Sequence, residues 1–343
     1  MGEKIGISPQ EIVRDRPEVE QLSLYVVKGA GALHPDSLRI TTTGVALDTW
    51  QGVALSEPVE DRGIVLLHAI PPENKKRRTD QSTWQYTSQL HNPRLVLVKP
   101  DILSDGTVIC NAPGMETLPL TETQMPQELP GGSVDLFDAT LHNNGFNDLG
   151  DTVSNWFSKF LQTPCRAVRF RPDTSFENKS KYHKYTLPLR GADDAQMLLM
   201  NEASVADLNE RLGGDQRVSM DAFRPNITLA GLPAYEEDML QEILIGNVPV
   251  TIVKPCIRCA VTMVDETTGT RRKDGQPLNE LSTYRLMKED TDGRIKTRGV
   301  ALGVYGTVLS AQNQESTNLT ITVGDELKIL QSSPSPLPFH ALS

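Results

Sequence analysis

Residues 253–265 read VKPCIRCAVTMVD, an apolar and β-branched run that carries Cys256 and Cys259, two of the four cysteines in the chain. Pro255 lies directly before the first of them. Proline has no N–H to donate to a sheet, and it favours an extended residue before it. We therefore expect a first strand to end at Val253, before this proline, and a second strand to begin at Cys259. The two thiols should project from the tight turn between these strands.

Several chemistries fit a pair of cysteines at this spacing, and the neighbouring residues separate them. A redox dithiol opens a helix, whose N-terminus lowers the thiol pKa, but the residues after Cys259 are typical of a strand. A structural zinc site needs more Cys or His ligands, and Cys110 and Cys165 stand alone. A thiolate held out to a bound metal or cofactor is the third interpretation, since Lys254 and Arg258 add charge that favours the ionised form. Packing in the core is the fourth, because free cysteines are often buried.

Composition and charge limit the classes of function. The chain has 343 residues, 38% hydrophobic and 23% charged, as in ordinary globular proteins. A formal net charge of −10 argues against nucleic acid or an anionic membrane as a partner, because phosphate binding needs clustered positive charge. We interpret the basic cluster at 75–78 as a solvated loop. No apolar run approaches the ~18 residues of a membrane helix, and the N-terminal residues lack a signal-peptide core. The few cysteines predict a cytoplasmic location.

Alternation of apolar and polar residues predicts strands along most of the chain. A turn at Gly324-Asp325 is expected to join the last two strands as a hairpin. The expected strands lie at 22–26, 38–40, 45–47, 64–67, 95–98, 243–245, 248–253, 259–264, 300–302, 304–309, 319–323 and 327–330.

Two helices are expected among these strands. Apolar residues between 153 and 161 recur at helical spacing, and Asp151 is placed to cap the start. The second helix is expected at 204–212, with Ser204 as its N-cap and Gly213 at its end. The predicted fold class is therefore α+β, mainly β.

The composition also divides the chain into segments. A stretch rich in Pro, Thr and Met separates two β-rich parts and is interpreted as a connection. The expected segments are a polar leader (1–18), an N-terminal β domain (19–110), a connecting stretch (111–135), a second domain (136–330) and a disordered tail (331–343).

Three segments, taken in order, resemble one family. They are LLMNEAS at 198–204, FRPNI at 223–227 and KPCIRC at 254–259. This pattern is similar to that of the MOSC proteins of the amidoxime-reducing type, which bind molybdenum cofactor and reduce N-hydroxylated compounds. The resemblance is strongest from about residue 153 to 330, and it implies a MOSC β-barrel domain preceded by an N-terminal MOSC-type β domain.

The resemblance implies roles for particular residues. The second cysteine of the family motif ligates molybdenum, which implies Cys259 as the metal ligand and catalytic residue. A soft thiolate suits a metal that the dithiolene sulfurs of molybdopterin already hold. Cys256 has no metal role in the family, and we interpret it as a packing residue or a redox-sensitive thiol. The cofactor contacts of the family map onto Lys28, Arg224, Asn226 and Arg258, which suit a phosphate-bearing pterin.

Three positions depart from the family pattern in the N-terminal half. The family has Val-Lys-Ser where this chain has Val27-Lys28-Gly29, so a hydroxyl that holds the cofactor phosphate is missing. The family places an Asp-Arg pair after its second strand, where we align Asp48-Thr49. Gln89 replaces a further arginine. Each lost charge-assisted hydrogen bond would cost about 1.5–3 kcal/mol of binding free energy.

Three functions follow as hypotheses. The first, implied by the resemblance, is a molybdenum-dependent reductase of amidoximes, hydroxylamines and N-hydroxylated bases. Since no cysteine follows Cys259, we expect no appended iron–sulfur domain, and electrons would come from a separate electron-transfer protein. The second is a degenerate MOSC scaffold that binds a partner without molybdenum. The third is a persulfide carrier, with Cys259 holding the sulfur.

Overall fold

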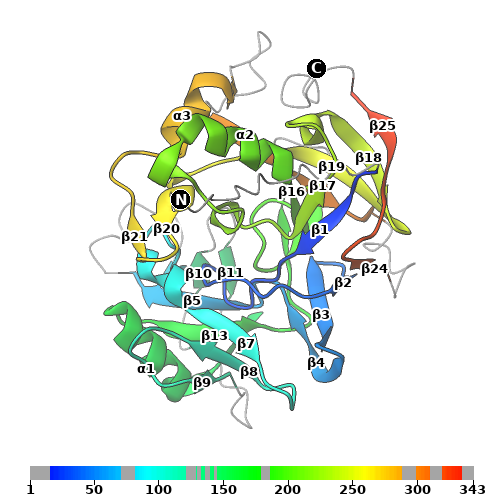
Figure 1. Cartoon of the computed structure of the whole chain (residues 1–343). Coiled ribbons are helices and arrows are strands. Elements are labelled where there is room, and N and C mark those ends of the chain that lie inside the picture. Colours follow the sequence, from blue (N-terminus) through cyan, green and yellow to red (C-terminus); the bar gives the residue numbers. More distant parts are fainter. Residues whose placement is uncertain are drawn as a thin grey trace, which may run out of the picture.

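The protein is a mainly β structure with three α-helices among the residues that the computed structural model describes (Figure 1). These residues are 16–70, 82–120, 129, 133–135, 140–142, 145–178, 186–287, 299–309 and 319–333. The basic cluster at 75–78 and most of the predicted leader and tail lie outside them. Within them, no helix is long and apolar enough to cross a membrane.

The largest sheet brings together strands from both ends of the chain. Its order is β1-β17-β16-β23-β19-β18-β25, and β22 pairs with β23 beside this path. The amide of Val19 donates to the carbonyl of Asp325 at 3.0 Å, and Glu18 is bridged to Glu326. These contacts join the two ends of the order, so the sheet closes on itself there. The bounds are β1 Glu18–Leu22, β16 Met197–Asn201, β17 Ile227–Ala230, β18 Leu240–Ile245, β19 Val248–Ile257, β22 Leu286–Met287, β23 Gly299–Thr307 and β25 Leu327–Ser332.

The second large sheet has the order β11-β10-β6-β5-β13-β12. The helix α1 (Gly150–Leu161) packs against β13, below the first sheet in the view of Figure 1. Its apolar face, which includes the buried side chains of Phe157 and Phe160, joins the main core. The bounds are β5 Ile64–Ala69, β6 Ser82–Tyr86, β10 Ser133–Asp135, β11 Thr140–His142, β12 Phe146–Asp148 and β13 Arg166–Phe170.

Smaller sheets and helices complete the fold. One sheet has the order β24-β2-β3-β4, another the order β7-β8-β9, and β14-β15 and β20-β21 form two short pairs. The strand bounds are β2 Ser37–Ile40, β3 Val45–Trp50, β4 Val53–Glu60, β7 Lys99–Ile102, β8 Val108–Asn111, β9 Leu118–Pro119, β14 Phe176–Asn178, β15 Leu187–Leu189, β20 Val264–Asp265, β21 Thr270–Arg271 and β24 Thr320–Thr322. The helix bounds are α2 Glu202–Leu212, α3 Leu278–Tyr284, and the 3₁₀ turns η2 Pro93–Leu97, η4 Gly214–Gln216, η5 Asp221–Phe223, η6 Glu236–Met239 and η7 Ala260–Met263.

The two large sheets each use strands from both of the predicted domains. β1 belongs to the predicted N-terminal domain but pairs with β17, and β13 belongs to the predicted second domain but pairs with β5. The fold class, α+β and mainly β, is confirmed. The boundaries at 19–110 and 136–330 stay a prediction.

Several local predictions are wrong, and each has a physical reason. Residues 95–98 are not a strand, because Pro93 starts the 3₁₀ turn η2, and periodicity in so short an apolar run cannot separate the two. Residues 259–264 are not one strand either, since η7 follows Cys259. The turn at Gly324 joins β24 and β25, which lie in different sheets, so it is not a hairpin.

The predicted helices exist, but their caps differ. The side chain of Asn201, not that of Ser204, caps α2 by accepting from the amide of Ala203 at 3.2 Å. At α1 the carboxylate of Asp148, not that of Asp151, accepts from the amide of Gly150 at 2.8 Å. In both helices the side chain that accepts from the first turn lies three positions before the predicted cap. The prediction of Gly213 as the end of α2 is confirmed.

Candidate functional site

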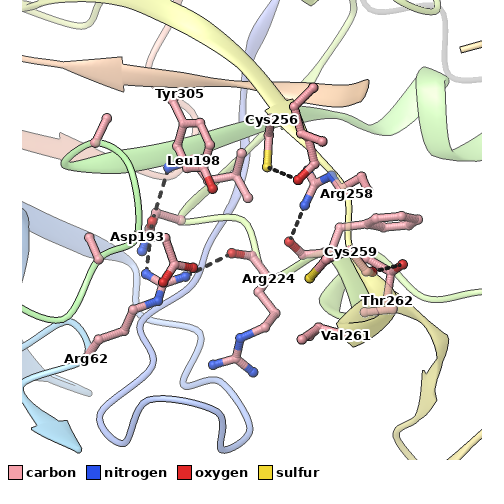
Figure 2. A pocket seen from close by; sticks show the side chains of 16 residues that line it. Arg62, Asp193, Leu198, Arg224, Cys256, Arg258, Cys259, Val261, Thr262 and Tyr305 are labelled. Carbon is pink, nitrogen blue, oxygen red and sulfur yellow. Dashed lines mark hydrogen bonds between the residues drawn. The ribbon is translucent and has the colours of Figure 1, made fainter. Parts of the chain in front are cut away.

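A pocket of about 120 Å³ lies where the second half of the chain meets the turn between β4 and β5 (Figure 2). Its wall comes from segments that are far apart in sequence. The lining residues are Arg62, Ala192, Asp193, Ala195, Leu198, Ala222, Phe223, Arg224, Asn226, Cys256, Ile257, Arg258, Cys259, Val261, Thr262 and Tyr305.

Cys259 is the exposed cysteine of the pocket. It directly precedes η7, and its carbonyl accepts from the amide of Thr262 at 3.2 Å and from the hydroxyl of the same residue at 3.0 Å. These two bonds fix the backbone that carries the thiol. Cys256 is buried instead, in an apolar cluster, and burial raises the pKa of its thiol. The packing interpretation of Cys256 therefore agrees with its position.

The turn predicted at Pro255 does not form, because β19 continues through it to Ile257. The register of β19 against β23 shifts between Pro255 and Ile257. An irregularity of this kind tolerates a residue without an N–H, since the ladder is already interrupted. As a result Cys256 lies within the strand, and only Cys259 lies beyond it.

Arg258 is buried and its guanidinium is held by the protein itself. It donates to the carbonyl of Leu302 at 2.8 Å and to the carbonyl of Phe223 at 2.9 Å. It therefore ties the end of β19 to β23 and to η5, as part of the pocket wall. A direct contact between Arg258 and a cofactor stays a prediction.

The guanidinium of Arg224 has one nitrogen that makes no hydrogen bond to the described residues. Its backbone is left-handed, with φ of 58°. One terminal nitrogen, Nη1, donates to the carbonyl of Ala30 at 2.7 Å, while the other, Nη2, is buried with no hydrogen-bond partner among the described residues. Burial lowers the pKa of this guanidinium, and the neighbouring charge of Arg62 lowers it further. An unpaired buried donor on a cation favours an anionic ligand.

Arg62 is a site residue that the sequence analysis missed. Its guanidinium pairs with Asp61 inside the protein and donates from Nη2 to the carbonyl of Arg224 at 3.2 Å. Asp61-Arg62 is an adjacent Asp-Arg pair that directly follows β4, so the chain contains such a pair, although not at Asp48-Thr49, where the family pattern is aligned. The strand before it, β4, is largely exposed and contains Pro58, and its weak apolar pattern hid it from prediction.

Lys28 stands behind the pocket wall and reaches it through Asp193. Its ammonium donates to the carbonyl of Gly191 at 2.7 Å, forms an ion pair with Asp193, and lies 5.0 Å from the ring centroid of Tyr86. Burial lowers the pKa of this ammonium, although the charge of Asp193 opposes the shift. Lys28 and Asp193 thus form a charged pair at the pocket edge.

Gly29 and Gln89, two of the departures from the family pattern, contact each other. The amide of Gln89 donates to the carbonyl of Gly29 at 2.6 Å. Gly29 has φ of 93°, and a Cβ at this position would lie 2.6 Å from Cδ2 of Leu95. Leu95 therefore packs closely against the turn at Gly29.

Asn226 is buried and organises the backbone beneath the pocket. Its side-chain oxygen accepts from the amide of Leu198 at 3.2 Å, and its amide donates to the carbonyl of Ser23 at 3.3 Å. It therefore connects β1 to β16. The pocket brings together four of the five predicted site residues, and Lys28 lies one side chain away.

Known protein families match both halves of the chain. Residues 16–164 match the family "MOSC N-terminal beta barrel domain", and residues 186–328 match the family "MOSC domain". The chain therefore belongs to the MOSC-domain proteins, with an N-terminal barrel domain before the MOSC domain, as the resemblance implies.

Within this family the chain is similar to the amidoxime-reducing components. It is 34% identical over 243 residues to "Mitochondrial amidoxime reducing component 2" of Rattus norvegicus, covering 68% of this chain and 66% of that protein. It is 37% identical over 228 residues to "Mitochondrial amidoxime-reducing component 1" of Danio rerio, covering 63% and 64%. It is also 31% identical over 219 residues to "Molybdenum cofactor sulfurase" of Bos taurus, covering 59% of this chain but 24% of that protein. The chain thus spans about two thirds of the length of the amidoxime-reducing relatives.

Proposed function

We propose that this protein is a molybdenum-cofactor-dependent oxidoreductase that reduces N-hydroxylated compounds. The observation that carries the proposal is the shared pocket of an exposed thiol, Cys259, and an arginine with an unpaired buried donor, Arg224. The names of the relatives support the same chemistry. Small N-hydroxylated molecules would be the substrates.

The residues present fit such a cofactor. A thiolate suits a soft metal, and guanidinium and ammonium groups suit a phosphate. The pocket of about 120 Å³ is smaller than the ~300–1,000 Å³ of pockets that enclose drug-sized ligands, so it encloses only part of a pterin. The exposed position of Cys259 leaves room for the remainder at the surface.

The side chains take different roles in this proposal. Cys259 would be the metal ligand and the catalytic residue, and Arg224, with Arg62 and Lys28, would bind the anionic end of the cofactor. Asn226 and Arg258 would hold the backbone on which these groups stand. When bound, the cofactor would supply the redox chemistry that removes oxygen from an N–OH group.

Reduction of N–OH to N–H consumes electrons and protons and releases water, so an electron donor is needed. We propose a separate electron-transfer protein for this step. A cytoplasmic location is the sequence-based prediction, whereas the relatives are named as mitochondrial proteins. Fractionation of cells that express the protein would decide between the two.

Metal analysis tests the proposal. Protein made in a cofactor-competent host should contain about one molybdenum per chain, together with pterin. The molybdenum content of Cys259→Ser should be at least about tenfold lower than that of the wild type, because a hydroxyl is a poor ligand for a soft metal. Cys256→Ala is the matched control and should keep the metal, since this thiol is buried in an apolar cluster. A folded wild-type protein without molybdenum or pterin would instead favour a scaffold that has lost the cofactor.

A sulfur-transfer role is the second candidate, favoured by the exposed thiol and by the similarity to molybdenum cofactor sulfurase. In that case Cys259 would carry a persulfide. Mass spectrometry after persulfide-selective labelling should then find the added sulfur on Cys259 and not on the buried Cys256. Unmodified Cys259 after incubation with a sulfur donor would exclude this role.

A further inference from the structure

Asp193 is the exposed carboxylate at the edge of the pocket. It lies on the loop between β15 and β16, and its side chain is 59% exposed. Its partner Lys28 is only 12% exposed. Figure 2 shows the Asp193 side chain between Arg62 and Tyr305, on the side of the pocket away from Cys259. An exposed acid therefore covers a buried ammonium.

Positive charge is in excess around this carboxylate. Arg62 is already paired with Asp61 inside the protein, whereas Arg224 forms no ion pair among the described residues. Desolvation by the surrounding protein disfavours the ionised form of Asp193, but the charges of Lys28 and Arg62 outweigh this effect and lower its pKa. Asp193 is thus held as an anion by the same cations that would attract a phosphate.

The loop that carries Asp193 is fixed on both sides of it. On one side, a Cβ at Gly191 would lie 2.0 Å from the carbonyl oxygen of Arg62, so the backbones are in close contact there. On the other side, Asp194 pairs with the buried Lys254 at 2.9 Å. The carboxylate of Asp193 can leave Lys28 by rotation of its own exposed side chain, without movement of the loop.

We propose that Asp193 is an internal competitor for the anion-binding part of the pocket. A phosphate-bearing ligand reaches Lys28 by replacing the Asp193 carboxylate, and the released side chain turns to solvent. In the absence of such a ligand, the pair with Asp193 compensates the buried charge of Lys28. The inference rests on the proposed function for the identity of the ligand, but phosphate itself is enough to test it.

Calorimetric titration of the metal-free full chain with inorganic phosphate, at low salt and pH 7.5, tests the competition. Asp193→Asn should bind phosphate about tenfold more tightly than the wild type, because the competing carboxylate is gone. The matched control is Asp194→Asn, which removes the same charge one residue away from a different lysine, and it should change the affinity less than about twofold. Adding Lys28→Ala to Asp193→Asn should remove the gain.

Two results would overturn the proposal. Equal gains in phosphate affinity in Asp193→Asn and Asp194→Asn would mean that the affinity depends only on the net charge of the protein. An unchanged phosphate affinity in Asp193→Asn would mean that the carboxylate does not compete. Circular dichroism of each variant confirms that it is folded. Because the titration needs neither molybdenum nor activity, this proposal can fail while the reductase proposal stands, and the metal analysis can fail while this proposal stands.

Discussion

At the scale of single residues, two guanidinium groups of the pocket pack against one aromatic ring. The guanidinium carbons of Arg224 and Arg62 lie 4.1 Å and 4.8 Å from the ring centroid of Tyr25. The hydroxyl of Tyr25 donates to the carbonyl of Pro225 at 3.1 Å, which fixes the ring. Both arginines have left-handed backbones, with φ of 58° and 53°. Such conformations in non-glycine residues cost roughly 1–3 kcal/mol each and gather at functional sites, which agrees with an anion-binding role here.

Restoring the family residue at position 29 should destabilise this protein. In Gly29→Ser the new Cβ would meet Leu95 at 2.6 Å, on a backbone with φ of 93° that side chains rarely adopt. We expect a loss of about 2–4 kcal/mol in the free energy of unfolding, measured by urea denaturation. Gly52→Ser is the matched control, because Gly52 has a similar φ of 79° but open space around it. If both variants lose the same amount, backbone strain alone is responsible and the contact with Leu95 does not matter.

At the scale of elements, the end of β19 decides which side chains of the pocket wall are buried and which are exposed. Alternation along an extended chain sends Cys256 and Arg258 inward, where they are 3% and 8% exposed. Ile257 and Cys259 point outward, and Ile257 is 37% exposed. The same alternation explains why the guanidinium of Arg258 donates to buried carbonyl groups, while the thiol of Cys259 stays accessible.

The N-cap of α2 provides a prediction at this scale. Asn201 is fully buried, caps the helix through its oxygen, and donates from its amide to the carbonyl of Pro233 at 2.7 Å. Asn201→Ala removes both interactions at a fully buried position. We expect a loss of about 2–3 kcal/mol in thermal unfolding experiments. Glu210→Ala, at an exposed position of the same helix, should stay within about 0.5 kcal/mol of the wild type. A loss below about 1 kcal/mol in Asn201→Ala would show that another group takes over the cap.

At the scale of the whole molecule, the sequence is informative where a pattern is local and fails where distant segments meet. Helical periodicity predicts α1 and α2, and three short motifs predict the family and four pocket residues. Arg62 and Asp193 carry no such local signal, because their importance arises only when the β4–β5 turn and the 191–195 loop converge. The pairing of β1 with β17 cannot be predicted from local sequence either. The pattern of apolar residues in β1 does not indicate that its partner strand lies about 200 residues later in the chain.

Two buried acids connect η6 to α2 and to the end of α3. Glu237, in η6, is fully buried and accepts a hydrogen bond from Ser204 of α2 at 2.8 Å. Its neighbour Asp238 pairs with Arg285, which follows α3, at 2.6 Å. The other carboxylate oxygen of Glu237, Oε1, has no partner among the described residues. Burial, and then the charge of Asp238, raise the pKa of Glu237 to about 7.

This shift predicts a pH-dependent stability of the whole fold. The folded protein binds the proton of Glu237 more tightly than the unfolded chain, whose glutamate has an ordinary pKa near 4.3. The free energy of unfolding contributed by this group is therefore fully present below that value, and it is lost as the pH rises through about 7. We expect a loss of about 2–3 kcal/mol between pH 5 and pH 8 in urea denaturation experiments.

The variant Glu237→Gln isolates this effect from the growing negative charge of the molecule. Glutamine keeps an oxygen that accepts from Ser204 but does not ionise. At pH 5 the variant should be close to the wild type in stability, and at pH 8 it should be more stable by about 2–3 kcal/mol, because the wild type alone must hold a buried charge. The general charge effect is common to both proteins and cancels in their difference. Parallel curves for the two proteins across this range would mean that Glu237 is ionised in the folded state at pH 5 as well, and that a group beyond those described here stabilises its charge.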